Sequence, residues 1–227
     1  AQMGATPHTG TQRLLIAFSI IGALLVGLGI ILLLAHNWDE FSRSTKLMIA
    51  ITPLIISQGL ALFTLQQKPH SAPWQESSAT LAWLTLGSAL AIVSQTYHLG
   101  GHLGDLLSVW MVLALPIMYL LRSQMAAILS LIGITAMGAL IAYDENRNAE
   151  QWRYWLLLAA WLPYYYQRLK KATQSWGTAI FNWLLALSLS VMSLAFLDLL
   201  FDDVRDHLVA LYCMVIALCF YAISRIP

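Results

Sequence analysis

The stretch LLIAFSIIGALLVGLGIILLLA, from Leu14 to Ala35, contains no charged side chain. A helix needs about 20 such residues to cross the roughly 30 Å hydrocarbon core of a bilayer. The composition of the whole chain agrees, because 59% of its residues are hydrophobic and only 10% are charged. A soluble domain cannot bury so large an apolar fraction. The sequence therefore predicts an integral membrane protein.

Further apolar stretches follow this one at similar intervals, separated by short polar joints. In lipid, only a helix satisfies every backbone hydrogen bond within one segment, so we expect an all-α, polytopic bundle. The longest joint, Gln66 to Ser78, leaves no room for a second soluble domain. We therefore expect a tail over residues 1–13 and a single transmembrane domain over residues 14–227. The domain would hold about eight spans in four helical hairpins, at 14–35, 47–65, 79–97, 106–121, 125–143, 154–167, 177–200 and 208–224.

Lysine and arginine positions predict the orientation of these spans. Seven of them flank one side, including the Arg168, Lys170 and Lys171 cluster, and five flank the other. The positive-inside rule then places both termini in the cytoplasm, and we expect a bacterial inner membrane. Nearly all acidic residues fall on the opposite side, with only Glu76 on the cytoplasmic side. The extracytoplasmic side is therefore the chemically distinctive one.

The strongest local pattern is QTYHLGGHLGD over residues 95–105. Its three glycines permit backbone turns that are closed to other residues, and such turns would let His98, His102 and Asp105 converge. A tight interhelical loop with histidines at the membrane interface explains the same pattern. Both interpretations stay open at this point.

The first half of the chain resembles a known family. A glycine-rich first helix that ends in Asn-Trp precedes a Gln-x-Tyr element at the end of the third span. Together these features are similar to the bacterial membrane family catalogued as domain of unknown function 2157. The resemblance implies a membrane protein, and it implies no activity, ligand or catalytic residue. The residues that carry it are Gly22, Gly27, Gly29, Asn37, Trp38, Lys46, Gln95, Tyr97, Trp110 and Pro116.

The first functional hypothesis is a protein that binds or transports a polar or amphiphilic solute. Ionisable or polar groups near a bundle interior are costly in a membrane and therefore indicate a site or a pathway. Binding is expected at the extracytoplasmic ends of the spans. The candidate residues are Asn37, Trp38, Gln95, Tyr97, Trp110 and Asp198.

Two alternatives remain. One is a metal-assisted hydrolase at the outer leaflet, with His98, His102, Asp105 and His207 as ligands of a zinc ion that activates water. No glutamate follows His98 as a zincin motif requires, so we expect no cofactor, no bound zinc and no hydrolytic activity. The other is a subunit that binds another membrane module or a periplasmic protein. The lipid bilayer is the expected surrounding, and the near-neutral charge excludes nucleic acid as a partner.

Overall fold

A computed structural model describes residues 38–144, 150–171 and 176–200. The predicted tail and the predicted spans 14–35 and 208–224 lie outside these residues. The chain divides into two compact units, Ala1–Lys46 and Leu47–Pro227. In the described ranges the elements are a short 3-10 helix and six α-helices, with no strand: η1 (Trp38–Glu40), α2 (Arg43–Gln67), α3 (Ala72–Tyr97), α4 (Leu103–Leu121), α5 (Gln124–Ala142), α6 (Trp152–Lys171) and α7 (Trp176–Leu200).

The all-α prediction is confirmed for this part of the chain, and four helices are long and apolar enough to cross a membrane. They are α2, α3, α4 and α5. Helix α6 is not among them, because its ends carry Arg153, Arg168 and Lys170 around a short apolar centre. Helix α7 has 25 residues, and the stretch of it with described side chains, Gly177–Ser193, is apolar. The count of eight spans stays a prediction.

One predicted joint is wrong. Residues 66–78 were expected to be a loop, yet α2 continues to Gln67 and α3 begins at Ala72. Pro73 lies in the first turn of α3, where proline is favourable because the backbone N–H there has no partner within the helix. Ser71 takes the extended backbone conformation of an N-cap. Polar residues in this segment therefore extend the two helices rather than interrupt them.

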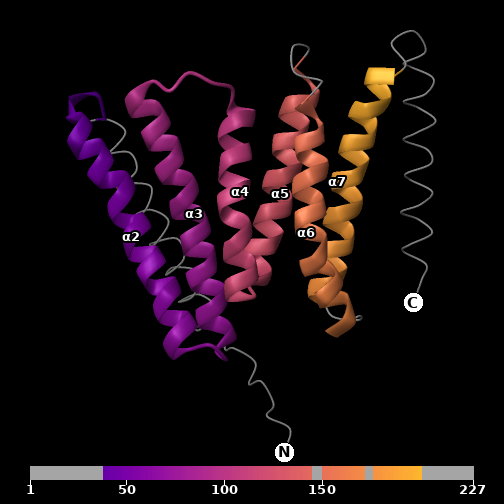
Figure 1. Cartoon of the computed structure of the whole chain (residues 1–227), viewed down its shortest axis with the longest axis horizontal. Helices are drawn as coiled ribbons and strands as arrows, with labels where there is room; N and C mark the ends of the chain where they lie inside the picture. The colour runs from indigo at the N-terminus through magenta and orange to yellow at the C-terminus, as the bar shows by residue number, and fades with distance from the viewer. Residues whose placement is uncertain (1–37, 145–149, 172–175, 201–227) are drawn as a thin grey trace, which may run out of the picture. The chain divides into compact units, whose positions relative to one another are not determined.

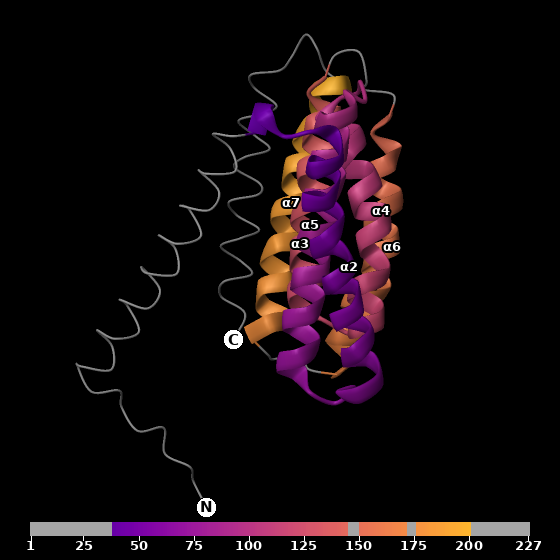
Figure 2. The same cartoon turned by 90° about the vertical axis from the view of Figure 1, so that its left-hand side faces the viewer.

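Successive helices from α2 to α7 run in opposite directions, and α5 lies at the centre of their contacts (Figures 1 and 2). It packs against α3, α4, α6 and α7. Small residues on α5 allow this close approach: an added Cβ at Gly133 would meet Met111 at 2.4 Å, and one at Gly138 would meet Tyr154 at 2.7 Å. Close contact of this kind replaces the hydrophobic drive that lipid cannot supply.

Buried hydroxyl groups connect α5, α6 and α7. The Thr135 hydroxyl donates to the Ser188 Oγ at 2.7 Å, and the Tyr154 and Ser188 hydroxyls lie 2.8 Å apart. Tyr154 and Ser188 are 0% and 1% exposed. Polar groups without a partner in an apolar interior are costly, so this network favours one arrangement of the three helices.

Candidate functional site

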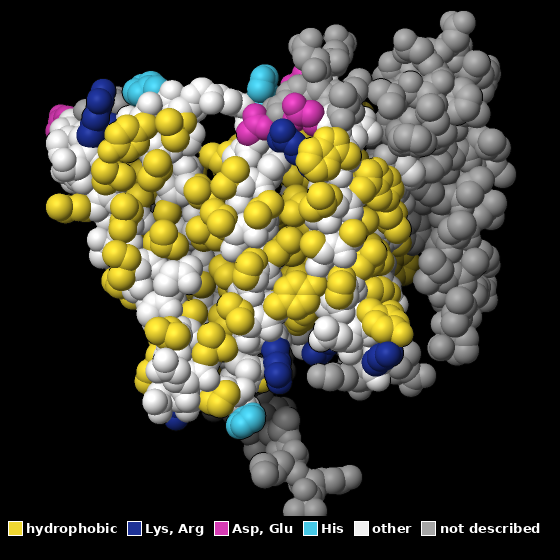
Figure 3. Space-filling view, in the orientation of Figure 1, with side chains coloured by type: hydrophobic (Ala, Val, Ile, Leu, Met, Phe, Trp, Pro, Cys, Tyr) yellow, Lys and Arg dark blue, Asp and Glu magenta, His cyan; other side chains and the backbone are white. Residues whose placement is uncertain are grey.

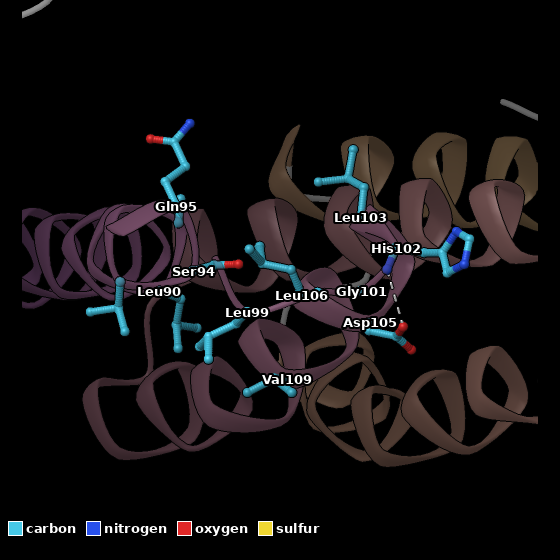
Figure 4. Close-up of a pocket in the computed structure, with 13 residues that line it drawn as sticks. Leu90, Ser94, Gln95, Leu99, Gly101, His102, Leu103, Asp105, Leu106 and Val109 are labelled. Atoms are coloured by element: carbon cyan, nitrogen blue, oxygen red, sulfur yellow. Dashed lines mark hydrogen bonds between the residues drawn. The ribbon is translucent and has the colours of Figure 1, made fainter. Parts of the chain in front are cut away.

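A cavity of about 550 Å³ lies where α3 ends and α4 begins. Figure 3 shows the surface hollowed just below the loop that joins these helices, and Figure 4 shows the side chains around it. Most of the wall is apolar, and Ser94, His102 and Asp105 supply polar groups at the end nearest the loop. The apolar wall is formed by Leu90, Ala91, Val93, Leu99, Leu103, Leu106 and Val109.

The loop beside this cavity is built differently from the prediction. His98, rather than a glycine, takes the left-handed conformation that ends α3, with φ 49°. The Leu99 N–H then bonds to the Ser94 carbonyl at 3.1 Å, which satisfies one of the last carbonyls of α3. Of the three glycines, only Gly101 has a φ, 153°, that favours glycine. Gly104 lies inside α4, where an added Cβ would approach the Ile141 side chain at 3.0 Å.

The rim of the cavity is acidic. Arg153 of α6 forms ion pairs with Asp105 at 2.8 Å and with Glu150 at 3.0 Å. The Asp144 carboxylate lies 3.6 Å from the His102 Nδ1. Two carboxylates thus pair with one guanidinium and a third lies beside His102, and the acidic side chains gather at this end of the helices in Figure 3.

The predicted binding residues are only partly brought together. Gln95 is among the residues around the cavity, but its side chain is exposed and points away from it in Figure 4. Within the described residues the Gln95 side chain forms no hydrogen bond, because it lies at an exposed helix end. Tyr97 is 45% exposed. Asn37 lies outside the described residues and Trp38 belongs to the other compact unit, beside Lys46. A binding role for Asn37 and Trp38 stays a prediction.

Trp110 has a packing role in the structure. Its Nε1 donates to the Trp83 carbonyl at 3.1 Å, and the two indole rings lie 4.4 Å apart. The Trp83 Nε1 in turn donates to the Ser130 hydroxyl of α5 at 3.1 Å. Trp110 therefore joins α4 to α3 rather than lining the cavity. The side chain of Asp198 is outside the described set.

The cavity residues that were not among the predicted binding residues are mostly apolar. Leu103, Leu106 and Val109 recur every third position, and this spacing places them on one side of a helix. That signal is present in the sequence, but the lipid-facing side of any membrane helix gives the same signal. Only the structure distinguishes the two.

The proposed metal ligands do not converge within the described residues. No group of three or more His, Cys, Asp or Glu side chains there is placed to hold a metal ion. His98 caps α3, and His102 and Asp105 face Asp144 and Arg153, respectively. His207 lies outside the described residues. The zinc hypothesis therefore receives no support from the loop that suggested it.

Comparison with known proteins gives one match. A family described as "Predicted membrane protein (DUF2157)" matches residues 1–127, which is more than half of the chain. Comparison with curated proteins and with solved structures gives no match. The matched residues include α2, α3 and α4, and with them the whole cavity wall. The chain belongs to the DUF2157 family of predicted membrane proteins.

Proposed function

We propose that this chain binds an amphiphile with a cationic or zwitterionic head group at the extracytoplasmic ends of α3 and α4. The observation that carries the proposal is the 550 Å³ cavity, which has an apolar wall and an acidic rim. An alkyl chain would lie along Leu90, Leu106 and Val109. The head group would meet Asp105 and the carboxylates around it.

Selectivity would come from the head group. An alkyl chain gains little by leaving lipid for an apolar groove, because the lipid tails are as apolar as leucine. A cationic group beside the Asp105 carboxylate at the cavity end gains charge-assisted hydrogen bonds, which are roughly twice as strong as neutral ones. A long-chain amine should therefore bind better than a fatty acid of the same length.

Filling the cavity should remove this binding. We expect Val109→Trp to weaken retention of a long-chain amine by about tenfold or more, because the added ring occupies the space meant for the alkyl chain. Val112→Trp is the matched control, since Val112 is on the same helix, is 55% exposed and does not line the cavity. Binding is measured by competition against a fluorescent alkyl amine in detergent.

Two outcomes would contradict the cavity as the binding site. One is equal binding by the two tryptophan variants. The other is equal affinity for the amine and for the fatty acid of matched length, since the acidic rim would then play no part.

We further propose that the chain crosses a bacterial inner membrane eight times, with both termini in the cytoplasm. Lys68, Arg122, Arg168 and Lys170 lie at the C-terminal ends of α2, α4 and α6, and these ends are on the same side because the helices alternate in direction (Figure 1). At the other ends of α4 and α6, Arg153 is paired with two carboxylates. An excess of cations at one end supports its placement on the cytoplasmic side.

Single-cysteine labelling checks the orientation, after Cys213 and Cys219 are changed to Ala. Cysteine at Gly100 should react with a membrane-impermeant maleimide in intact cells, and cysteine at His70 should react only after lysis. Both positions are exposed, and an added Cβ at Gly100 meets nothing within 4 Å, so neither change should disturb folding. The reverse pattern would invert the proposed orientation.

A further inference from the structure

A second cavity, of about 300 Å³, lies between α4 and α6 at the ends opposite the acidic rim. It is lined by Tyr119, Arg122, Tyr164, Gln167 and Arg168. Every one of these side chains carries a hydrogen-bonding group, and two of them are guanidinium groups. This lining contrasts with the apolar wall of the first cavity and indicates a different kind of ligand.

The two guanidinium groups have no anionic partner in the described part of the chain. Neither Arg122 nor Arg168 forms an ion pair there, and the buried Nε of Arg168 has no hydrogen-bond partner. The described acidic residue at this end, Glu76, is already held by the hydroxyl and amide groups that begin α5. A buried donor without an acceptor is costly, so a ligand that brings acceptor oxygen atoms to this cavity would be stabilised there.

The walls of this cavity are fixed by contacts that do not involve the guanidinium groups. The Tyr119 hydroxyl donates to the Ala160 carbonyl at 2.5 Å, and the Tyr119 and Tyr164 rings meet edge to face at 5.9 Å. Tyr164 is only 8% exposed. These contacts fix the two tyrosine side chains of the wall without a ligand, so these two donors need little ordering when one binds.

Arg122 holds an unusual position for an arginine. It ends α4 in the left-handed conformation, with φ 52°, where glycine or asparagine is the ordinary residue. Glycine would take this conformation without steric cost. The arginine therefore gives the local backbone no advantage, and its guanidinium group lines the cavity.

We propose that this cavity binds a phosphate group. Guanidinium groups match the oxygen atoms of phosphate with paired hydrogen bonds, and the amide of Gln167 and the hydroxyl of Tyr164 add further donors. The phosphate would belong to an anionic phospholipid head group or to free inorganic phosphate. The site is separate from the amphiphile cavity and does not depend on it.

The test uses the full chain in maltoside micelles, which contain no phosphate. Three probes are added separately: phosphatidylglycerol, inorganic phosphate, and diacylglycerol as a lipid without phosphate. The readouts are the thermal unfolding midpoint and the apparent Kd from its dependence on probe concentration. The variants are Arg122→Gly and Arg168→Gln, with Lys170→Gln as the control, because Lys170 lies on α6 over the Tyr166 ring and does not line the cavity.

We expect at least one phosphate-bearing probe to raise the midpoint and diacylglycerol to leave it unchanged. Stabilisation by phosphatidylglycerol alone identifies a lipid head group, and stabilisation by inorganic phosphate as well identifies phosphate itself. Arg122→Gly should fold normally yet weaken binding by about tenfold or more, as should Arg168→Gln, while Lys170→Gln should bind like the unmodified chain. No stabilisation by either phosphate probe, or stabilisation that survives both arginine substitutions, would overturn the proposal.

Discussion

Replacing Gly87 with alanine is expected to destabilise the bundle by about 3 kcal/mol, combining overpacking with the loss of a hydrogen bond. An added Cβ at Gly87 would lie 2.0 Å from the Trp110 Cζ2 and 2.1 Å from its Cε2. The ring cannot shift easily, because its Nε1 donates to the Trp83 carbonyl and its centroid lies 4.4 Å from that of the tilted Trp83 indole. Thermal unfolding in detergent measures the change.

Gly59→Ala is the control for this prediction. Gly59 also lies inside a helix, α2, but an added Cβ there meets nothing within 4 Å. Alanine should leave stability unchanged or raise it by about 0.4–1 kcal/mol, because glycine loses more conformational freedom on folding. Combining Gly87→Ala with Trp110→Phe should recover part of the loss, since the smaller ring vacates the contact. Equal stability of the two alanine variants would show that Trp110 does not pack on Gly87.

Glu76→Gln is expected to destabilise the protein by about 2–3 kcal/mol, because the carboxylate of α3 caps the start of α5. One carboxylate oxygen of Glu76 accepts from the Ser123 hydroxyl at 2.5 Å and from the Met125 N–H at 3.0 Å. The other oxygen accepts from the Gln124 N–H at 2.8 Å. Glutamine keeps one acceptor oxygen and loses the charge that favours a helix N-terminus. Thermal unfolding again provides the measurement.

The matched control for this change is Glu40→Gln, at an exposed residue, and it should alter stability by less than about 0.5 kcal/mol. Ser123→Ala should show a smaller loss than Glu76→Gln, because both backbone amides stay bonded to the carboxylate. A Glu76→Gln variant as stable as Glu40→Gln would show that Glu76 does not join α3 to α5.

Helix class and most helix centres were predictable from the sequence, because long uncharged runs have only one stable form in lipid. The predicted spans 106–121 and 125–143 agree with α4 and α5 to within a few residues. The joint at 66–78 was wrong because polar residues also occur where helices extend beyond the apolar layer. The predicted span 154–167 is shorter than α6 for the same reason, since the charged ends of this helix leave a short apolar centre.

The candidate sites were less predictable, because they depend on contacts between distant residues. The pair of Asp105 and Arg153 joins residues 48 positions apart, and so does the bond between Glu76 and the Gln124 N–H. Residue type alone identified Asp105 as polar but gave no partner for it. Trp110 was predicted to be a binding residue, but its position against Gly87 shows a packing role instead. In the sequence, Glu76 is distinguished only as the one acidic residue that is expected on the cytoplasmic side of the membrane.

The most direct test of the proposed function is photolabelling of the unmodified chain with a long-chain amine that carries a diazirine on its alkyl chain. Mass spectrometry then maps the adducts. We expect saturable labelling of Leu90, Leu106 and Val109, reduced by unlabelled amine more than by a fatty acid of equal length. Unsaturable labelling spread evenly over exposed residues away from the cavity, such as Leu120 and Ile132, would contradict it.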